Sequence, residues 1–250
     1  MPGFSETIAG DAESLAPRVA FISGYRRRGP ESYRALNTVT RACEQAGANC
    51  LPISFDIIPL GKHKTLPPFS EMVQKSVSAI NDNPAPTVLL GHCGGGAVAI
   101  EALKKIDPSL ILGLVFLCPA FAPAEKTSPF RSPGAFVKRS LGWLHKNVFS
   151  SADYKAVHTN RRAYGAAVGE VFGDLTATTS FGIPKEKVIF IGTSEDRISS
   201  TPATQRFTSI HDFPYHLLQD DHSVRRPENM PLLANIIRSL THASAPAVSC

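Results

Sequence analysis

Cysteine, charge and long apolar runs are all scarce in this sequence, and each shortage excludes a class of protein. Its five cysteines are irregularly spaced, with no Cys-x-x-Cys pair and no His-rich segment, so we expect neither a disulfide framework nor a metal site. The longest apolar run, Leu110–Cys118, is far shorter than the roughly 20 residues that cross a bilayer, so we expect no membrane span. The first eighteen residues do not resemble a secretory signal, which favours a cytoplasmic protein in a reducing compartment.

Charged residues make up only 19% of the chain, and 26 basic against 21 acidic side chains leave a net charge of +5. That excess is too small and diffuse for a nucleic-acid groove unless it is clustered. Most of it falls in residues 119–178, which contain eight basic and four acidic side chains. We therefore expect a small-molecule substrate rather than a nucleic-acid partner.

The chain is long and apolar enough for one large domain, with 43% hydrophobic residues over 250 positions. Apolar segments of strand length alternate along it with amphipathic segments of helix length. Strands are predicted at residues 19–23, 51–55, 87–90, 110–117, 187–191 and 215–218, and helices at 31–46, 69–80, 95–106, 202–210 and 227–240. Because the strands are apolar throughout, the pattern indicates an α/β protein with a parallel sheet covered on both faces.

Residues 119–178 interrupt this alternation, because they are too many for a plain connection between core strands. They contain an amphipathic piece at 135–149 with the only tryptophan, Trp143, and we interpret the stretch as an inserted lid. The predicted divisions are an N-terminal extension (1–17), a core (18–118 and 179–242), the lid (119–178) and a flexible tail (243–250).

A glycine-rich turn, Gly91-His92-Cys93-Gly94-Gly95-Gly96, joins the strand at 87–90 to the next helix. Nucleophiles often stand on such a strained turn, which requires glycine two residues before and two after the nucleophile. Gly91 and Gly95 occupy those positions around Cys93. The start of the helix would favour a thiolate there, and the Gly94 N–H would point at a developing oxyanion.

Two other interpretations of this turn are open. Glycine-rich turns also bind phosphate, and a single cysteine is often a small core residue. Neither a Gly-x-Gly-x-x-Gly nor a Gly-Lys-Ser/Thr motif is present, which favours a catalytic turn. Cys43, Cys50 and Cys118, in contrast, fall in apolar elements and are predicted to be core residues.

A cysteine nucleophile needs a base to take its proton and an acid to orient that base. In the chain order nucleophile, acid, base, the acid follows a late strand and the base follows the last strand. Glu195 and Asp196 both follow the strand at 187–191, and His222 follows the strand at 215–218. The spacing alone leaves both carboxylates open as the acid.

Together these residues resemble the α/β-hydrolase superfamily, over about residues 18–242. The turn at 91–96 is similar to the Gly-His-Ser-x-Gly-Gly elbow of thioesterases and related hydrolases, with cysteine in place of serine. In this it resembles dienelactone hydrolases and some natural-product thioesterase domains, whose nucleophile is a cysteine. Gly192-Thr193-x-x-Asp196 resembles the acid turn of the family, which favours Asp196 over Glu195. His222 followed by Pro227-Glu228 resembles its histidine loop.

The resemblance also implies a fold and a second oxyanion donor. Ser23-Gly24-Tyr25 stands where the family commonly has His-Gly-aromatic, so the Tyr25 N–H would act beside that of Gly94. Too few residues precede Arg18 for the opening hairpin of the family. We therefore expect an α/β-hydrolase fold with a reduced, mostly parallel sheet of about six strands, helices on both faces and the inserted lid.

These features predict acyl transfer through a covalent intermediate. Cys93 attacks an ester or acyl-thioester, His222 carries the proton, Asp196 orients the imidazole, and water releases the acid without any cofactor. An acyltransferase or a lactone-forming cyclase would use the same acyl-cysteine and is the closest alternative. A carbon–carbon hydrolase and a non-catalytic hydrolase-fold binding protein are less favoured alternatives.

Arginines mark the expected mouth of the site. Arg26, Arg27 and Arg28 follow the first strand and Arg225-Arg226 follow His222, and both loops emerge at the carboxyl ends of strands. Such a rim would attract a carboxylate, the phosphates of coenzyme A or an acidic acyl-carrier protein, although solvated surface arginines are an equally simple interpretation. His92 and Trp143 are further candidate substrate contacts.

Overall fold

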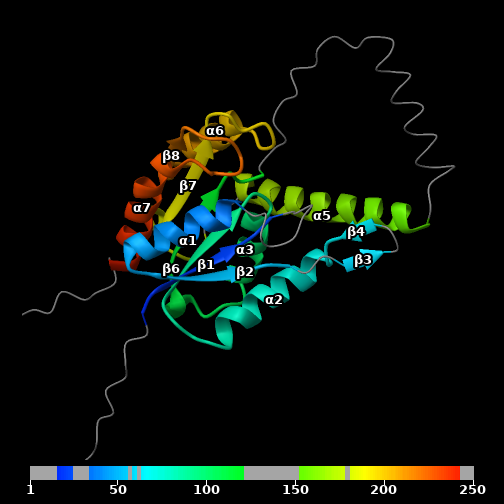
Figure 1. Ribbon diagram of the computed structural model, residues 1–250, viewed down its shortest axis with the longest axis horizontal. Helices are drawn as coiled ribbons and strands as arrows, with labels where there is room; N and C mark the ends of the chain where they lie inside the picture. The colour runs from blue at the N-terminus through cyan, green and yellow to red at the C-terminus, as the bar shows by residue number, and fades with distance from the viewer. Residues whose placement is uncertain are drawn as a thin grey trace, which may run out of the picture.

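A computed structural model describes residues 16–24, 34–55, 58–60, 63–120, 152–177 and 181–242. Figure 1 shows a central sheet with helices on both sides. Several predictions lie outside the described residues: the N-terminal extension up to residue 15, Tyr25, Arg26, Arg27, Arg28, the segment at 135–149 with Trp143, and the C-terminal tail.

Six strands form the central sheet, as the apolar runs predict. They are β1 (Arg18–Ile22), β2 (Asn49–Ile53), β5 (Thr87–His92), β6 (Ile111–Leu117), β7 (Val188–Thr193) and β8 (Tyr215–Leu218). Their order is β2-β1-β5-β6-β7-β8, and every neighbouring pair is parallel. The predicted fold class is therefore confirmed. Strand order reverses between β1 and β5, and ligands bind at the carboxyl ends of strands at such a point.

Helices cover both faces of this sheet because each has one apolar side. On one face lie α1 (Arg34–Ala46) and α7 (Met230–His242), and on the other α2 (Phe69–Asn81), α3 (Gly95–Leu103), α5 (Ala152–Ala177) and α6 (Thr201–His211). Short 3-10 helices η2 (Pro108–Leu110), η4 (Lys185–Lys187) and η5 (Pro227–Asn229) precede β6, β7 and α7. Within the described residues, no helix is both long enough and apolar enough to cross a membrane.

Two elements were not predicted. A short antiparallel hairpin, β3 (Ile58–Leu60) and β4 (His63–Thr65), follows β2. The long helix α5 occupies the second half of the predicted lid, and in Figure 1 it runs from the sheet to this hairpin. Val168, Val171 and Phe172 of α5 are buried in the same core as α2 and α3, so this part of the stretch packs onto the body of the protein.

Candidate active site

Cys93 lies between β5 and α3 with a φ of 56°, in the left-handed region that residues with a side chain rarely adopt. Hydrogen bonds hold it there: the Cys93 N–H donates to the Leu117 carbonyl at 2.9 Å, and the Gly96 N–H donates to the Cys93 carbonyl at 3.2 Å. The half-buried thiol therefore stands at the end of a central strand, at the start of a helix.

The two glycines that flank the turn allow close backbone contacts. A Cβ at Gly95 would collide with the Ile22 carbonyl of β1, and one at Gly91 would lie within 2.8 Å of three backbone atoms of Gly95 and Gly96. Real Cβ atoms do not approach backbone so closely, so larger residues would displace the turn. The sequence requirement for glycine at these positions thus has a steric cause.

His222 and Asp196 meet above the carboxyl ends of β7 and β8. The His222 Nδ1–H donates to Asp196 Oδ2 at 2.9 Å, while Asp196 Oδ1 accepts from the Ile198 and Ser199 N–H groups at 2.7 and 2.8 Å. The Asp196 side chain is only 1% exposed. Burial alone would raise the pKa of Asp196, but these hydrogen bonds and the charge of His222 lower it, so the carboxylate stays ionised.

Glu195, the other carboxylate that the spacing allows, points away from His222. Its side chain is 53% exposed and forms an ion pair with Arg226 at 2.6 Å. Arg226 also donates to the Gln219 carbonyl at 2.9 Å. The geometry therefore brings Asp196, and not Glu195, to the imidazole.

The imidazole also lies close to the thiol, because Cys93 is among the groups that shift the pKa of His222. Burial alone would lower the pKa of His222, but the hydrogen bond to Asp196 and the interactions with Cys93 and Asp196 outweigh burial and raise it to about 10. His222 in this arrangement keeps a proton at neutral pH.

A buried carboxylate braces the loop that carries His222. Asp220 is 0% exposed, and its side chain accepts from the Asp221 N–H, the Arg226 N–H and Asn229 Nδ2, each at 2.8 Å. Its carbonyl accepts from the Glu195 N–H at 2.9 Å, which ties the histidine loop to the acid turn. The sequence analysis missed this role, although Asp220 lies only two residues before His222.

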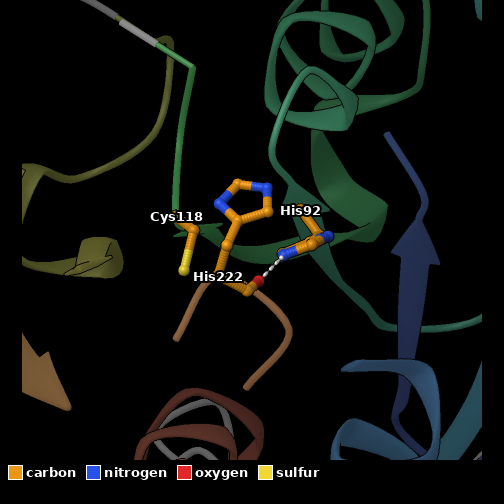
Figure 2. A group of neighbouring side chains, drawn as sticks. All are labelled: His92, Cys118 and His222. Atoms are coloured by element: carbon orange, nitrogen blue, oxygen red, sulfur yellow. Dashed lines mark hydrogen bonds between the residues drawn. The ribbon is translucent and has the colours of Figure 1, made fainter. Parts of the chain in front are cut away.

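His92 lies beside His222 and is hydrogen-bonded to its backbone carbonyl, as Figure 2 shows. Its ring is 3% exposed and stacks on Phe21, and its Nε2 lies 2.8 Å from the carbonyl oxygen of His222. Burial lowers the pKa of His92 to about 3, so the ring is neutral, and Nε2 must carry the hydrogen because a carbonyl only accepts. Rather than lining an exposed wall, His92 connects the nucleophile turn to the histidine loop.

Cys118 completes this buried group in Figure 2. It follows β6 with a φ of 49°, it is 1% exposed, and its Sγ lies 3.6 Å from Thr193 Oγ1. Burial raises the pKa of the Cys118 thiol well above its usual value, so the thiol is neutral. The side chains of His92, Cys118 and His222 place possible metal ligands within 4.8 Å of one another, but His92 Nε2 and His222 Nδ1 already form hydrogen bonds. We therefore interpret His92 and Cys118 as buried side chains that pack around the base.

The oxyanion side of the turn is described only in part. Gly94 is the N-cap residue just before α3, and a Cβ there would collide with the hydroxyl of Tyr164 from α5. Tyr164, which packs against Phe69, therefore forms a wall beside the Gly94 backbone, and the sequence analysis did not single it out. Gly24 approaches the turn from β1, since a Cβ there would lie 2.7 Å from the His92 carbonyl oxygen. Tyr25 follows immediately but lies outside the described residues, so its role as a donor stays a prediction.

A strained turn after a central parallel strand, with a carboxylate and a histidine after the two last strands, defines the class as α/β-hydrolase. The chain belongs to the alpha/beta hydrolase family, whose family model matches residues 14–231. This membership confirms the predictions of the superfamily and of a hydrolase enzyme.

Solved structures agree with this fold. The monoglyceride lipase of Saccharomyces cerevisiae superposes with a TM-score of 0.57 at 14% identity, covering 93% of this chain and 88% of the lipase. The monoacylglycerol lipase of Paleococcus ferrophilus superposes with a TM-score of 0.53 at 16% identity, covering 89% of this chain and 93% of the lipase. Carboxyl esterase 2 of Tuber melanosporum superposes with a TM-score of 0.55 at 13% identity, covering 93% of this chain and 78% of the esterase. Identities this low show the fold alone. No curated protein sequence matches the chain significantly.

Proposed function

We propose that this protein is a cysteine-dependent acyl hydrolase that cleaves an ester or acyl-thioester through a covalent acyl-Cys93 intermediate. One observation carries the proposal: the hydrogen-bonded pair of Asp196 and His222 lies beside a cysteine on a strained turn at the start of a helix. Because this constellation can activate a nucleophile and also return a proton to a leaving group, it is suited to acyl transfer.

The first half of the reaction forms the acyl-enzyme. The Cys93 sulfur attacks the substrate carbonyl carbon, and the Gly94 N–H, with that of Tyr25 as the family resemblance implies, stabilises the oxyanion. His222 then gives its proton to the departing alcohol or thiol, and the carbonyl re-forms as the bond to the leaving group breaks. Asp196 keeps the imidazole oriented and stabilises its positive charge.

In the second half, water resolves the acyl-enzyme. His222, now neutral, takes a proton from the water as it attacks the acyl-cysteine carbonyl, and the Cys93 thiolate leaves as the acid is released. An amine or alcohol in place of water would make the same site an acyltransferase or a cyclase. A nucleophilic thiolate also needs reducing conditions, which agrees with the cytoplasmic location expected from the sequence.

Basic side chains beside the histidine loop support an anionic substrate, such as a coenzyme A thioester or an acyl group on an acidic carrier protein. A groove of about 330 Å³ there is lined by Arg34, Arg41 and Arg225. Arg225 and Arg226 are both ion-paired, Arg225 with Asp221 at 3.0 Å and Arg226 with Glu195 at 2.6 Å. The anion-binding prediction therefore moves from these two residues to Arg34 and Arg41 of α1.

Salt dependence tests this part of the proposal. kcat/KM for a coenzyme A thioester should fall with ionic strength more steeply than for a neutral ester, because a positive field speeds the encounter with an anion. Arg34→Gln with Arg41→Gln should flatten that dependence, while kcat changes less. Equal salt dependence for both substrates, or no effect of the double variant, would remove the argument for an anionic substrate.

The main experiment is a mass spectrum of the intact protein after incubation with a panel of acyl-thioesters and activated esters. We expect an acyl adduct that maps to Cys93 and is absent from Cys93→Ala. Analysis of the products then separates free acid from transferred or cyclised acyl groups. Wild-type turnover in Cys93→Ala, or an adduct on another residue, would contradict the proposal.

A further inference from the structure

A second pair of reactive groups lies at the other end of the sheet. Cys43 is in the last turns of α1, and Cys50 is near the amino end of the edge strand β2, where it pairs with Val19. The site around Cys93 lies instead at the carboxyl ends of β5, β7 and β8. The catalytic mechanism uses neither Cys43 nor Cys50.

A tight turn brings the two cysteines together. Gly47 has a φ of 73°, its N–H donates to the Glu44 carbonyl at 3.2 Å, and the Ala48 N–H donates to the Cys43 carbonyl at 3.0 Å. This pattern ends a helix and reverses the chain, so β2 begins beneath the last turn of α1. Thr40 Oγ1 of α1 donates to Cys50 Sγ at 3.6 Å, and Cys43 lies one turn further along the same helix, so the two thiols lie close enough for each to shift the pKa of the other.

The two sulfurs have different surroundings. Cys43 is 0% exposed, whereas Cys50 is half-buried and lines a groove of about 470 Å³ together with Arg18 and Leu51. The interaction with Cys43, together with the hydrogen bond from Thr40 Oγ1 at 3.6 Å, outweighs burial and lowers the pKa of Cys50 to about 7. The same contact raises the pKa of Cys43. Cys50 is therefore the accessible nucleophile, and Cys43 is a buried thiol in contact with it.

We propose that Cys43 and Cys50 are a redox site that a hydroperoxide converts into a reversible disulfide, independently of Cys93. The Cys50 thiolate attacks one oxygen of the peroxide, the O–O bond breaks, and a sulfenic acid and hydroxide form. The Cys43 sulfur then attacks the Cys50 sulfur, the S–S bond forms, and the sulfenic oxygen leaves as water with the Cys43 proton. The two cysteines together lose two electrons, which the peroxide gains. Two equivalents of a small thiol reduce the disulfide back to the two thiols.

The oxidised pair would connect the end of α1 to β2 covalently. A crosslink restricts the unfolded chain, but the loop between Cys43 and Cys50 is short, so its effect on unfolding is modest. We expect oxidation to raise Tm by up to about 5 °C. Reduction should reverse this change.

Peptide mapping of the full-length protein tests the proposal. Wild type and Cys93→Ser are treated with stoichiometric hydrogen peroxide, quenched with N-ethylmaleimide and digested. We expect a peptide that links Cys43 to Cys50 in both proteins, loss of two maleimide adducts, and full reversal by dithiothreitol. The Cys93→Ser background makes this outcome independent of whether Cys93 is the catalytic nucleophile.

Single variants supply the controls. Cys43→Ser and Cys50→Ser should each abolish the linked peptide, whereas Cys118→Ser, which changes a buried thiol elsewhere, should leave it intact. A linkage through Cys93, Cys118 or Cys250 would overturn the proposal. So would oxidation of Cys50 to the sulfinic acid with no linkage in wild type.

Discussion

In the two proposals, the carboxyl and amino ends of the sheet each carry a reactive cysteine, and the two cysteines differ in what surrounds the sulfur. At the carboxyl end, Cys93 contacts an imidazole that is backed by the buried carboxylate of Asp196. At the amino end, Cys50 contacts the thiol of Cys43. An imidazole can pass a proton to a leaving group, and a second thiol can take part in disulfide formation. On these proposals, the neighbour of the sulfur, more than the cysteine itself, decides between acyl transfer and redox chemistry.

Backbone strain differs between the two ends as well. Cys93 adopts a left-handed conformation at the end of a strand, whereas Cys50 lies within β2 in ladder register with Val19. Strain concentrates at functional sites where the surrounding structure imposes it. The hydrogen bonds to Leu117 and from Gly96, with the close contacts of Gly91 and Gly95, provide that constraint at Cys93.

The largest expected effect on kcat comes from removing Cys93 or His222 at the carboxyl end of the sheet, in comparison with removing Cys50 at the amino end. Cys93→Ala and His222→Ala should each lower kcat roughly 10³-fold or more, because members of a catalytic unit act together. Cys50→Ala should keep turnover near that of wild type. Steady-state rates with one acyl-thioester measure all three variants. Comparable losses of kcat in Cys93→Ala and Cys50→Ala would contradict the different roles proposed for the two cysteines.

The next largest effect on kcat distinguishes the two carboxylates that follow β7, Asp196 and Glu195. Asp196→Asn should lower kcat by about 10²–10⁴-fold, because the amide leaves the imidazolium without its counter-charge and disturbs its orientation. Glu195→Gln removes only an exposed ion pair with Arg226 and should leave kcat almost unchanged. Both variants are assayed against the same substrate. A severe loss in Glu195→Gln with a mild one in Asp196→Asn would reverse the assignment of the acid.

A smaller effect on kcat is expected from replacing His92, the neighbour of the base His222. His92→Phe keeps an aromatic ring but loses the hydrogen bond to the His222 carbonyl, and a hydrogen bond of this kind corresponds to about tenfold in kcat. KM should change less, because His92 is a positioning residue. His92→Gln, which retains an N–H donor, should recover part of the loss and restore the pH profile of kcat. A rise in KM alone would instead assign His92 to substrate binding.

The smallest expected effect concerns the pKa of Cys50, at the amino end of the sheet. The rate of Cys50 alkylation by iodoacetamide should rise with pH through a midpoint near 7, since the pKa of Cys50 is about 7. Cys43→Ala removes the strongest interaction that lowers this pKa, so the midpoint should move upward. Peptide-resolved labelling across a pH series measures it. A midpoint that the variant leaves in place would mean that the contact between the thiols does not control Cys50.

Much of the fold could be predicted because its signals are local. Continuous apolar runs mark all six central strands, and Gly91 and Gly95 mark the turn around Cys93. The contact between Asp196 and His222 also follows from the sequence pattern, since both come after strands whose carboxyl ends share one edge of a parallel sheet. Family resemblance then favoured Asp196 over Glu195, in agreement with the geometry.

The missed features have weak or non-local signals. In α5, Val168, Val171 and Phe172 recur at helical spacing, but Gly165 and Gly169 lie among them, and glycine is a poor helix former. The strands of the hairpin β3–β4 are three residues each, too short for alternation to be visible.

Side-chain contacts across the fold were also missed. The hydrogen bond from His92 to the His222 carbonyl depends on side-chain directions that no local pattern encodes. The exposure of Cys50 was predicted wrongly. It was taken for a core residue, but it lies on the edge strand and is half-buried.

Rapid-quench trapping of a single turnover tests the central claim most directly. Enzyme in excess over an acyl-thioester is quenched in acid at successive times, and the acyl group is located by peptide mapping. The account predicts that the acyl group appears on Cys93 and leaves it at rates fast enough to support kcat, while none accumulates on Cys50. Turnover without a Cys93 acyl intermediate, or an intermediate formed and lost more slowly than kcat, would contradict it.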